Sequence, residues 1–322
     1  MRMLRIANDL VGENAVAQTA KGVSSSYESN GQPARKSTGQ AALRTLSIDI
    51  GGTGLKASVL GPDGAMLTDR ARVVTTYPLP PAELIRHLTE LVKPLPTFDR
   101  VSVAFPGVVR EGRVLSAPHF VTVKGPGSKI DPKLVQLWKD FDLGAAIVTA
   151  FAKPCRVMND ADMQGIDVMT GTGVELVITL GTGLGTAIFQ NGRLGPRLEF
   201  SQHPFRKGET YNEQVGDAAR KKVGNKNWNK RVAKAVATLD NLMFFDKVYI
   251  GGGNAASLKV DLGPKAVKID PNAGILGGIK LWDHPPLLTA IEGRAWAFIQ
   301  AVGLGAELSG RCMSEGGLAL VL

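Results

Sequence analysis

The sequence has few of the residues that define secreted, membrane-spanning or metal-cluster proteins. Of its 322 residues, 6% are aromatic and only two, Cys155 and Cys312, are cysteine. Two cysteines exclude a disulfide framework and a cysteine-rich zinc cluster. No charge-free apolar stretch reaches the roughly 18–20 residues needed to cross a bilayer, and the basic start has no uninterrupted apolar core. We therefore expect a soluble cytoplasmic protein with no membrane partner.

Apolar residues and glycine are abundant. Apolar residues make up 44% of the chain, charged residues 21%, and there are 38 glycines. With this length, the balance favours a globular α/β protein with two domains and many tight turns. The net charge of +9 fits good solubility, and it also fits a polyanionic partner if the charge is concentrated in one segment.

Hydrophobic periodicity begins only near residue 45. The preceding segment is polar and rich in serine and glycine in its middle, so it buries too little surface to offset the entropy of ordering. Beyond it, two α/β halves each open with a strand, a glycine turn and a second strand, at 46–60 and 176–190. The expected division is a disordered extension over 1–44, an N-terminal domain over 45–155, a C-terminal domain over 156–282, and an unassigned, partly helical tail over 283–322.

Alternating and helical patterns predict the main elements of both halves. Strands are expected at 46–50, 56–60, 101–105, 176–180, 186–189 and 248–250. An apolar helical face is expected within 82–92, and a second one follows Trp228, Val232, Val236, Leu239 and Met243. The stretch between Gly107 and the strand near 156 is interpreted as rich in loops.

Two glycine-rich turns are the first candidates for chemistry. Gly181 to Gly185 follows a strand, but another strand and an Asn191-Gly192 turn come next, so the helix that a dinucleotide fingerprint needs is missing. The chain also has no GxxxxGK[ST] phosphate loop. A glycine turn lets backbone amides approach phosphate oxygens closely, although either turn alone is equally well explained as a tight β-turn.

The first turn also carries an acid and a base, Asp49 and Lys56. A carboxylate beside a phosphate cradle suits Mg²⁺ bound largely through water. A turn-capping aspartate is the alternative interpretation.

Five motifs together resemble the ROK sugar kinases in order and spacing. They are Asp49–Lys56, Phe105–Gly107, Asn159–Asp162, Leu180–Gly183 and Gly251–Gly253. The resemblance covers residues 45–282 and implies an α/β fold of the two-domain actin/hexokinase/Hsp70-like (ribonuclease H-like) class. Within the family, the chain is most similar to polyphosphate-dependent glucokinases. The segments that carry this closer likeness are Phe105–Arg110, Leu180–Thr186, Pro204–Tyr211 and Asn272–Gly277.

The resemblance implies the roles of individual residues. Asp160 matches the catalytic aspartate, which orients the sugar 6-hydroxyl and takes its proton, although Asn159-Asp160 also reads as a helix N-cap. The implied sugar-binding residues are Asn159, Glu199, Gln202, His203 and Glu213. The implied phosphate-binding residues are Asp49, Gly51, Gly52, Thr53, Lys56, Gly181, Thr182 and Gly183, with Asp49 also holding Mg²⁺ through water. The implied nucleoside-binding residues are Gly251, Gly252 and Gly253.

The chain departs from the family pattern in the sugar-binding segment. Gln202 stands where the family's Glu-x-Gly-His motif places histidine, and His203 follows it. Glutamine can donate and accept hydrogen bonds to sugar hydroxyls, so sugar specificity stays open. Glu213 is equally well explained as an exposed helix acid.

Positive charge is concentrated between residues 204 and 235. Nine basic residues there face three acidic ones, a net charge of +6 out of the chain's +9. A solvated helix face is one interpretation. The other is a track that binds a polyphosphate chain with strong salt dependence. The track residues are Lys221, Lys222, Lys230 and Arg231.

These observations predict a sugar kinase that transfers a phosphoryl group from polyphosphate, with ATP as a further donor, to the 6-hydroxyl of glucose or a similar hexose. Mg²⁺ is the expected cofactor, and the resemblance implies a homodimer with no nucleic-acid partner. One alternative is a strictly ATP-dependent hexose kinase. Another is a non-catalytic, sugar-responsive ROK regulator, although only 48 residues precede Asp49 and regulators carry a longer helix-turn-helix segment there.

Overall fold

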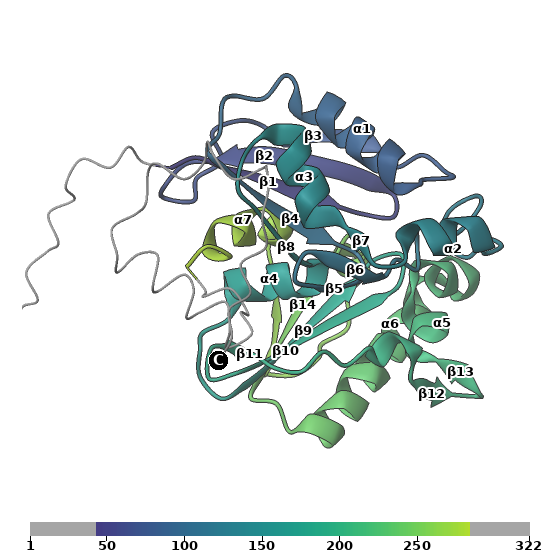
Figure 1. Cartoon of the computed structure of the whole chain (residues 1–322). Coiled ribbons are helices and arrows are strands. Elements are labelled where there is room, and N and C mark those ends of the chain that lie inside the picture. Colours follow the sequence, from purple (N-terminus) through teal and green to yellow (C-terminus); the bar gives the residue numbers. More distant parts are fainter. Residues whose placement is uncertain (1–42, 284–322) are drawn as a thin grey trace, which may run out of the picture. The chain divides into compact units, whose positions relative to one another are not determined.

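A computed structural model describes residues 43–283, and the interpretations of residues 1–42 and 284–322 lie outside them. The described chain contains two five-stranded sheets with helices packed against them (Figure 1). No helix in this part of the chain is both long and apolar enough to span a membrane.

The first sheet is built from the N-terminal half. Its strands are β1 (Thr45–Ile50), β2 (Gly54–Leu60), β3 (Ala71–Val74), β4 (Arg100–Phe105) and β8 (Cys155–Asn159), in the order β3-β2-β1-β4-β8. The pair β1–β2 is antiparallel, whereas β4 runs parallel to both β1 and β8. The first glycine turn (Gly51–Thr53) joins β1 to β2.

The period-two pattern of β1 separates core from site. Leu46, Ile48 and Ile50 belong to the hydrophobic core of this half. Ser47 and Asp49 alternate with them and point to the opposite face of the sheet, as strand geometry requires. The same short segment therefore builds the core and presents a carboxylate on the other side.

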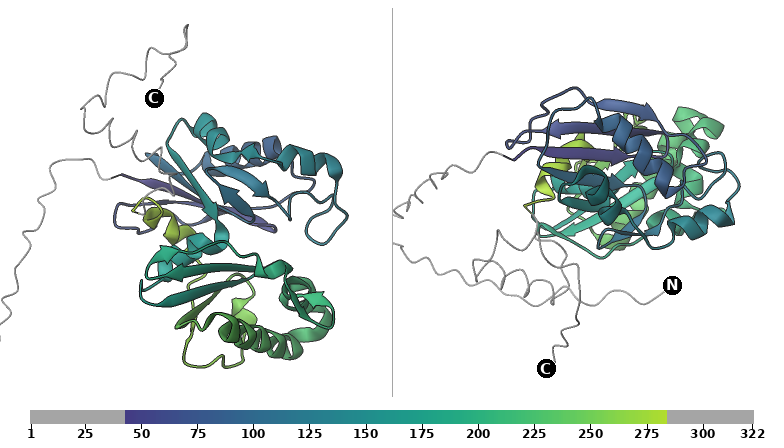
Figure 2. Two further views of the ribbon diagram at one scale, coloured as in Figure 1. Left: turned by 60° about the horizontal axis from the view of Figure 1, so that its bottom comes forward. Right: turned by 45° about the horizontal axis from the view of Figure 1, so that its top comes forward.

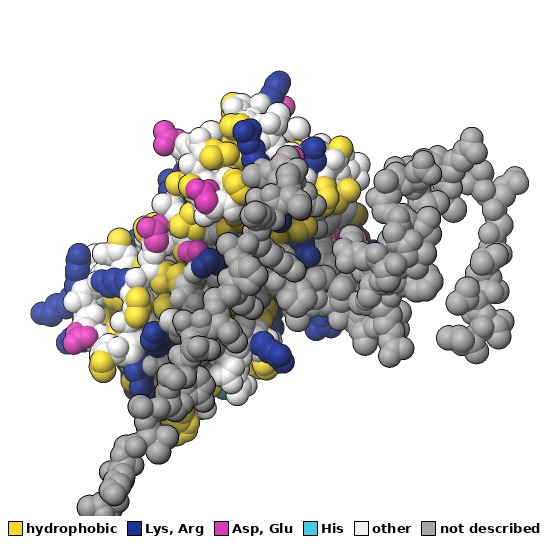
Figure 3. Space-filling model, turned by 90° about the vertical axis from the view of Figure 1, so that its left-hand side faces the viewer, with side chains coloured by type: hydrophobic (Ala, Val, Ile, Leu, Met, Phe, Trp, Pro, Cys, Tyr) yellow, Lys and Arg dark blue, Asp and Glu magenta, His cyan; other side chains and the backbone are white. Residues whose placement is uncertain are grey.

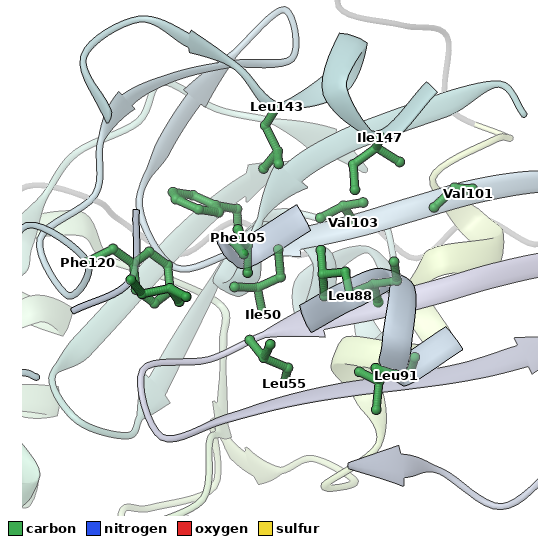
Figure 4. Packing of buried hydrophobic residues seen from close by; sticks show 14 of the residues in the cluster. Ile50, Leu55, Leu88, Leu91, Val101, Val103, Phe105, Phe120, Leu143 and Ile147 are labelled. Atoms are coloured by element: carbon green, nitrogen blue, oxygen red, sulfur yellow. The ribbon is translucent and has the colours of Figure 1, made fainter. Parts of the chain in front are cut away.

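Helices α1 (Pro81–Val92) and α3 (Leu143–Phe151) cover the core face of the first sheet. Figure 4 shows Leu88 of α1 and Ile147 of α3 pointing toward Val103 of β4. All the residues of the apolar face expected in α1 are buried, so this helix prediction is confirmed.

The second sheet is built from the C-terminal half. Its strands are β9 (Val174–Leu180), β10 (Leu184–Gln190), β11 (Arg193–Leu194), β14 (Lys247–Gly251) and β15 (Ala266–Lys268), in the order β11-β10-β9-β14-β15. β9 and β10 are antiparallel, and the second glycine turn (Gly181–Gly183) joins them. Helix α6 (Asp217–Met243) packs on this sheet through the predicted stripe, of which only Met243 remains partly exposed.

Two helices lie between the sheets, α4 (Asp160–Val168) and α7 (Ala273–Lys280), as Figures 1 and 2 show from three directions. Glycine allows α7 to pack this closely. A Cβ atom at Gly277 would lie 2.0 Å from the Met163 carbonyl oxygen of α4, and one at Gly278 would lie 2.2 Å from Ser47 Oγ of β1. Ser47 Oγ donates a hydrogen bond of 2.7 Å to the Ile275 carbonyl, which fixes α7 to the first sheet.

The stretch interpreted as loop-rich is in fact structured, so that prediction was wrong. It holds α2 (Pro132–Trp138), α3 and a small sheet of β5 (Val108–Arg110), β6 (Arg113–Ser116) and β7 (Phe141–Asp142). Asp131 and Asp142 cap the two helices by accepting hydrogen bonds from Lys133 N and Ala145 N. Both helices are short, and too little periodicity marks them in the sequence.

The expected domain boundary between residues 155 and 156 falls inside β8. This strand pairs with β4 along Val101↔Cys155 to Phe105↔Asn159, so the first sheet continues to Asn159 and the division between the sheets follows it. The remaining elements are η1 (Phe200–Gln202), β12 (Pro204–Arg206), β13 (Glu209–Thr210), α5 (Tyr211–Val215) and η2 (Ala255–Ser257).

Candidate active site

The acid and the base of the first glycine turn pair across the hairpin. Asp49 of β1 lies opposite Lys56 of β2, and Lys56 Nζ is 2.7 Å from Asp49 Oδ2. Both side chains keep some exposure, 17% for Asp49 and 27% for Lys56. The lysine therefore holds one carboxylate oxygen in place, while the structure gives the other oxygen no partner among the described residues.

The carbonyl groups of the first glycine turn are bound by the protein. Thr75 Oγ1 donates to the Gly51 carbonyl and Tyr77 OH donates to the Gly52 carbonyl, each at 2.7 Å. Within residues 43–283, the amides of Gly52 and Thr53 have no acceptor. The turn is thus fixed through its acceptors and keeps two donors for a ligand.

The second glycine turn is likewise held through its carbonyl groups and keeps two unbonded amides within the described residues. Asn254 Nδ2 donates to the Gly181 carbonyl at 2.9 Å, and the Asp217 amide donates to the Thr182 carbonyl at 3.1 Å. The amides of Thr182 and Gly183 have no acceptor in the described part of the chain. Since Asp217 is the first residue of α6, the N-terminus of that helix lies directly against this turn.

Two glycines of the second turn have different surroundings. A Cβ atom at Gly183 would lie 2.2 Å from Asn212 Oδ1, which itself accepts a hydrogen bond from Leu184 N. Gly183 is therefore needed for packing against α5. A Cβ atom at Gly181 would meet no heavy atom within 4 Å, so a side chain there would clash only with a bound ligand.

Asp160 is the first residue of α4 and is partly buried. Burial raises its pKa from 3.8 to about 7, and the negative charges of Asp49 and Asp162 act in the same direction. The Ala161 amide, 2.9 Å from Asp160 Oδ1, and the Arg197 charge oppose this rise in pKa. A carboxyl group with a pKa near neutrality at a helix N-terminus is suited to exchange a proton with a substrate.

Asn159 forms the N-cap of α4, as the alternative interpretation of Asn159-Asp160 expected. Its Oδ1 accepts hydrogen bonds from Ala161 N at 2.8 Å and Asp162 N at 3.4 Å. Its Nδ2 donates to the carbonyls of Phe105 and Gly107, at 3.4 and 2.9 Å. The side chain connects the Phe-Pro-Gly segment to α4, and sugar binding by Asn159 stays a prediction.

The predicted sugar-binding residues after β11 lie at the surface. Gln202 and His203 are exposed, and the Glu199 side chain keeps 46% exposure. Arg197 Nη1 approaches Glu199 Oε1 at 3.4 Å. Glu213 is exposed and forms a capping box, in which its carboxylate accepts from the backbone amide and hydroxyl of Thr210. Hydrogen bonding to Thr210 lowers the pKa of Glu213.

The third glycine segment follows β14 and packs beside the second turn. Gly252 has φ +84°, and a Cβ atom there would lie 2.4 Å from the Leu180 carbonyl oxygen, so only glycine fits. Gly253 has no heavy atom within 4 Å of the Cβ position. Asn254 then donates its side-chain amide to the second turn, so Gly251–Gly253 and Gly181–Gly183 lie side by side.

Gln164, which sequence reasoning did not single out, connects these groups. It lies one helical turn after Asp160 on α4. A Cβ atom at Gly274 would be 3.6 Å from Asp49 Cγ and 3.7 Å from Gln164 Cγ, and one at Gly251 would be 2.4 Å from Gln164 Oε1. The spacing of four residues from Asp160 was the available signal, because such residues share a helix face.

The predicted track residues lie on α6. Lys221, Lys222 and Lys230 are exposed, while Arg231 is partly buried and donates from Nη1 to the Gln214 carbonyl at 3.3 Å. Lys221 pairs with Asp217 at 2.7 Å. The structure shows no ion pair for Lys222 or Lys230 within residues 43–283.

The helix bends at Gly224, whose φ of 75° and ψ of 159° interrupt α6. The bend brings the second part of the helix back to α5. There Trp228 Nε1 donates to the Val215 carbonyl at 2.7 Å, and Arg231 reaches Gln214. Lys221 and Lys222 therefore lie near the N-terminus of α6, which adjoins the second glycine turn, and Arg231 lies against α5.

A surface hollow of about 490 Å³ lies elsewhere, between β3 and α1. Its lining includes Arg72, Val74 and His87, and none of the predicted site residues. The candidate active site is therefore defined by the glycine turns and α4, and not by this hollow.

Known proteins are similar to this chain over part of its length. The ROK family model matches residues 45–196. A polyphosphate glucokinase of Mycobacterium tuberculosis is 28% identical over 221 residues, which cover 65% of this chain and 77% of that protein. A polyphosphate glucokinase of Mycobacterium leprae is 27% identical over 219 residues, which cover 65% of this chain and 63% of that protein, less than two thirds of its length.

A solved structure extends the likeness beyond the family model. The crystal structure of the inorganic polyphosphate/ATP-glucomannokinase from Arthrobacter sp. strain KM superimposes with a TM-score of 0.64 at 25% identity. The match covers 75% of this chain and all of that one. The predicted actin/hexokinase-like α/β fold and the resemblance to ROK sugar kinases are confirmed.

Proposed function

We propose that this chain, which is similar to the ROK family over residues 45–196, is a sugar kinase that transfers a phosphoryl group from polyphosphate to the 6-hydroxyl of glucose, with ATP as a second donor. One observation carries the proposal. Asp160, a carboxyl group with a pKa of about 7, begins a helix between the two sheets, and each sheet has a glycine turn in which two amides lack an acceptor within residues 43–283. Phosphoryl transfer needs these two parts, a group for the hydroxyl proton and a cradle for phosphate.

The acceptor side of the reaction is assigned to α4 and the segment after β11. Asp160 would accept a hydrogen bond from the sugar 6-hydroxyl and take its proton as the phosphoryl group arrives. Glu199, Gln202 and His203 would bind other hydroxyls of the sugar. Near neutral pH a substantial fraction of Asp160 is ionised, as a base requires.

The donor side is assigned to the glycine turns. The amides of Gly52, Thr53, Thr182 and Gly183 would bind phosphate oxygens, and Lys56 would add a positive charge. Gly251–Gly253 would lie against the nucleoside when ATP is the donor. The open space over Gly181 and Gly253 supports the approach of a ligand to both segments.

Asp49 is suited to hold Mg²⁺. One of its oxygens is held by Lys56 and the other has no partner among the described residues, and Mg²⁺ commonly binds through one or two carboxylates, water and substrate phosphates. Within residues 43–283 no group of three His, Cys, Asp or Glu residues could hold a metal ion by itself. When bound, Mg²⁺ would neutralise phosphate charge.

The cations of α6 support polyphosphate as a donor. Lys221 and Lys222 lie in the second turn of a helix whose first amide bonds to Thr182 of the second glycine turn. A polyanion bound at the glycine turn would therefore continue along these lysines. Figure 3 shows Lys and Arg side chains spread over another face as well, so charge alone does not define the track.

A coupled assay for glucose 6-phosphate, with long-chain polyphosphate and ATP compared as donors, tests the proposal. Formation from both donors would support it. Formation from ATP alone would establish the strictly ATP-dependent hexose kinase. Sugar binding without product from either donor would favour the ROK regulator.

The track is tested by replacing Lys221, Lys222 and Lys230 together with Ala, leaving Arg231 because it bonds to the protein backbone. We expect the KM for polyphosphate to rise about tenfold or more and its salt dependence to flatten, with ATP use nearly unchanged. The matched control replaces three exposed lysines of the other half, Lys93, Lys133 and Lys139. Equal losses with both donors would contradict the proposed polyphosphate track, and so would equal effects of the control variant.

A further inference from the structure

Arg197 links the catalytic helix to the sugar-binding segment. Its Nη2 pairs with Asp162 Oδ2 on α4, and its Nη1 lies 3.4 Å from Glu199 Oε1. The arginine side chain is 19% exposed, that of Asp162 7% and that of Glu199 46%. A mostly buried guanidinium group thus bridges a buried carboxylate and a solvent-facing one.

The backbone around Arg197 is fixed by the second sheet and not by α4. The Gly195 amide donates to the Ile188 carbonyl at 2.7 Å, and Thr186 Oγ1 donates to the Leu198 carbonyl at 3.1 Å. These bonds attach the segment to β10. The guanidinium group is the side-chain link that the described structure shows between this segment and the first turn of α4.

The burial of Asp162 explains why its ion pair with Arg197 matters electrostatically. This carboxyl group lies two residues after Asp160 and is almost fully buried, which raises its pKa to about 6 while the Arg197 charge opposes the rise. Removing one partner of a buried ion pair leaves an uncompensated charge. Arginine suits the position because its planar fork can serve two carboxylates at once, whereas lysine offers a single point charge.

We propose that Arg197 is a positioning residue for the sugar, which holds the Glu199 carboxylate in a fixed relation to Asp160 by anchoring on Asp162. The inference rests on the proposed function and adds to it a determinant of sugar affinity. Asp162 is then the anchor on the catalytic helix. Glu199, half exposed and otherwise free to rotate, is restrained on one side and open to a ligand on the other.

The test compares Arg197→Met and Arg197→Lys in the full-length protein. We expect Arg197→Met to raise the KM for glucose about tenfold or more, with kcat changed less than about threefold, because the lost contact places the sugar and leaves Asp160 in position. Arg197→Lys should recover part of the affinity. The control is Arg113→Met, since Arg113 also bridges two carboxylates, Asp140 and Asp142, on the other half.

A second pair of variants separates positioning from simple stability. Arg197→Met leaves Asp162 buried without its partner and should lower Tm, whereas adding Asp162→Asn removes that buried charge and should restore Tm. The double variant should nevertheless keep the raised KM for glucose. A KM that recovers together with Tm would overturn the inference, because Arg197 would then serve the fold alone.

The outcomes also separate this inference from the proposed function. An active wild-type enzyme with an unchanged KM in Arg197→Met would overturn the role of Arg197 and leave the kinase assignment intact. If the wild type forms no product but binds glucose in calorimetry, the same comparison is made with Kd. A wild-type protein that neither phosphorylates nor binds a hexose would overturn both.

Discussion

The raised pKa of Asp160 should make the folded protein less stable at neutral pH than at acid pH, so Asp160→Asn should lower activity and raise stability at neutral pH. The substitution keeps the size of the side chain, and the N-cap of α4 stays with Asn159. The Ala161 amide, which donates to Asp160 Oδ1, can donate equally to an amide oxygen. The variant therefore removes the titration of Asp160 with little change in shape.

The magnitude follows from the pKa. In the unfolded chain Asp160 ionises near 3.8, and in the folded protein near 7, chiefly because of burial. Between these values the folded state holds a proton that the unfolded state has lost, so the free energy of unfolding falls as pH rises. Between pH 5 and pH 8 the loss amounts to about 2–3 kcal/mol for this pair of pKa values.

Asp160→Asn should escape this loss. Removing a negative charge from the first turn of α4 costs only about 0.3–1 kcal/mol through the helix dipole, so the relief from burial outweighs it. Urea unfolding at pH 5 and pH 8 measures the effect. We expect the stability of the variant relative to wild type to increase by about 2–3 kcal/mol between the two pH values. A difference that does not change with pH would contradict the raised pKa.

The same variant tests the catalytic role. In the wild type, kcat/KM should rise about tenfold from pH 6 to pH 8 as Asp160 ionises, and turnover should fall about 10²- to 10⁴-fold in Asp160→Asn. Sugar binding, measured by calorimetry, should be largely retained. A variant that keeps more than half of the wild-type turnover would show that Asp160 is not the base.

Two glycine substitutions test the turns and the bend of α6. Gly181→Ala should raise the KM for both donors about tenfold, the equivalent of one hydrogen bond to a charged group, without changing Tm or the KM for glucose, because its Cβ meets only ligand space. The matched variant Gly253→Ala should affect ATP and not polyphosphate, and identical effects of the two on both donors would refute the assignment of separate phosphate and nucleoside sites. Gly224→Ala should cost about 1–3 kcal/mol in urea unfolding, since φ 75° and ψ 159° suit only glycine. Its Cβ would meet nothing within 4 Å, so an unchanged stability would mean that α6 does not bend there.

A bulky residue at Gly183 would not report on phosphate binding alone. Valine there would collide with Asn212 Oδ1 and break the contact between the second glycine turn and α5. Gly181 is the cleaner probe of the same turn.

The sequence by itself determined the local elements and the resemblance to ROK sugar kinases. The alternation in β1, the helical stripe of α1 and the Asn-Asp pair that starts α4 are local patterns, and each appears in the structure where it was expected. The glycine turns were recognisable because a hairpin turn is formed by consecutive residues between two strand patterns. The capping box of Thr210 and Glu213 was equally readable from Thr-x-x-Glu, and it was missed.

Only the tertiary structure decided which side chains share an environment. Asp162 pairs with Arg197, 35 residues later, and Glu175 accepts a hydrogen bond from Tyr249, 74 residues later. The pKa of Asp160 depends on Asp49, more than 100 residues earlier, and on burial that no local pattern encodes. The physical reason is that hydrogen bonds, desolvation and charge act through space over a few ångströms, whereas periodicity and turn preference act along the chain over a few residues.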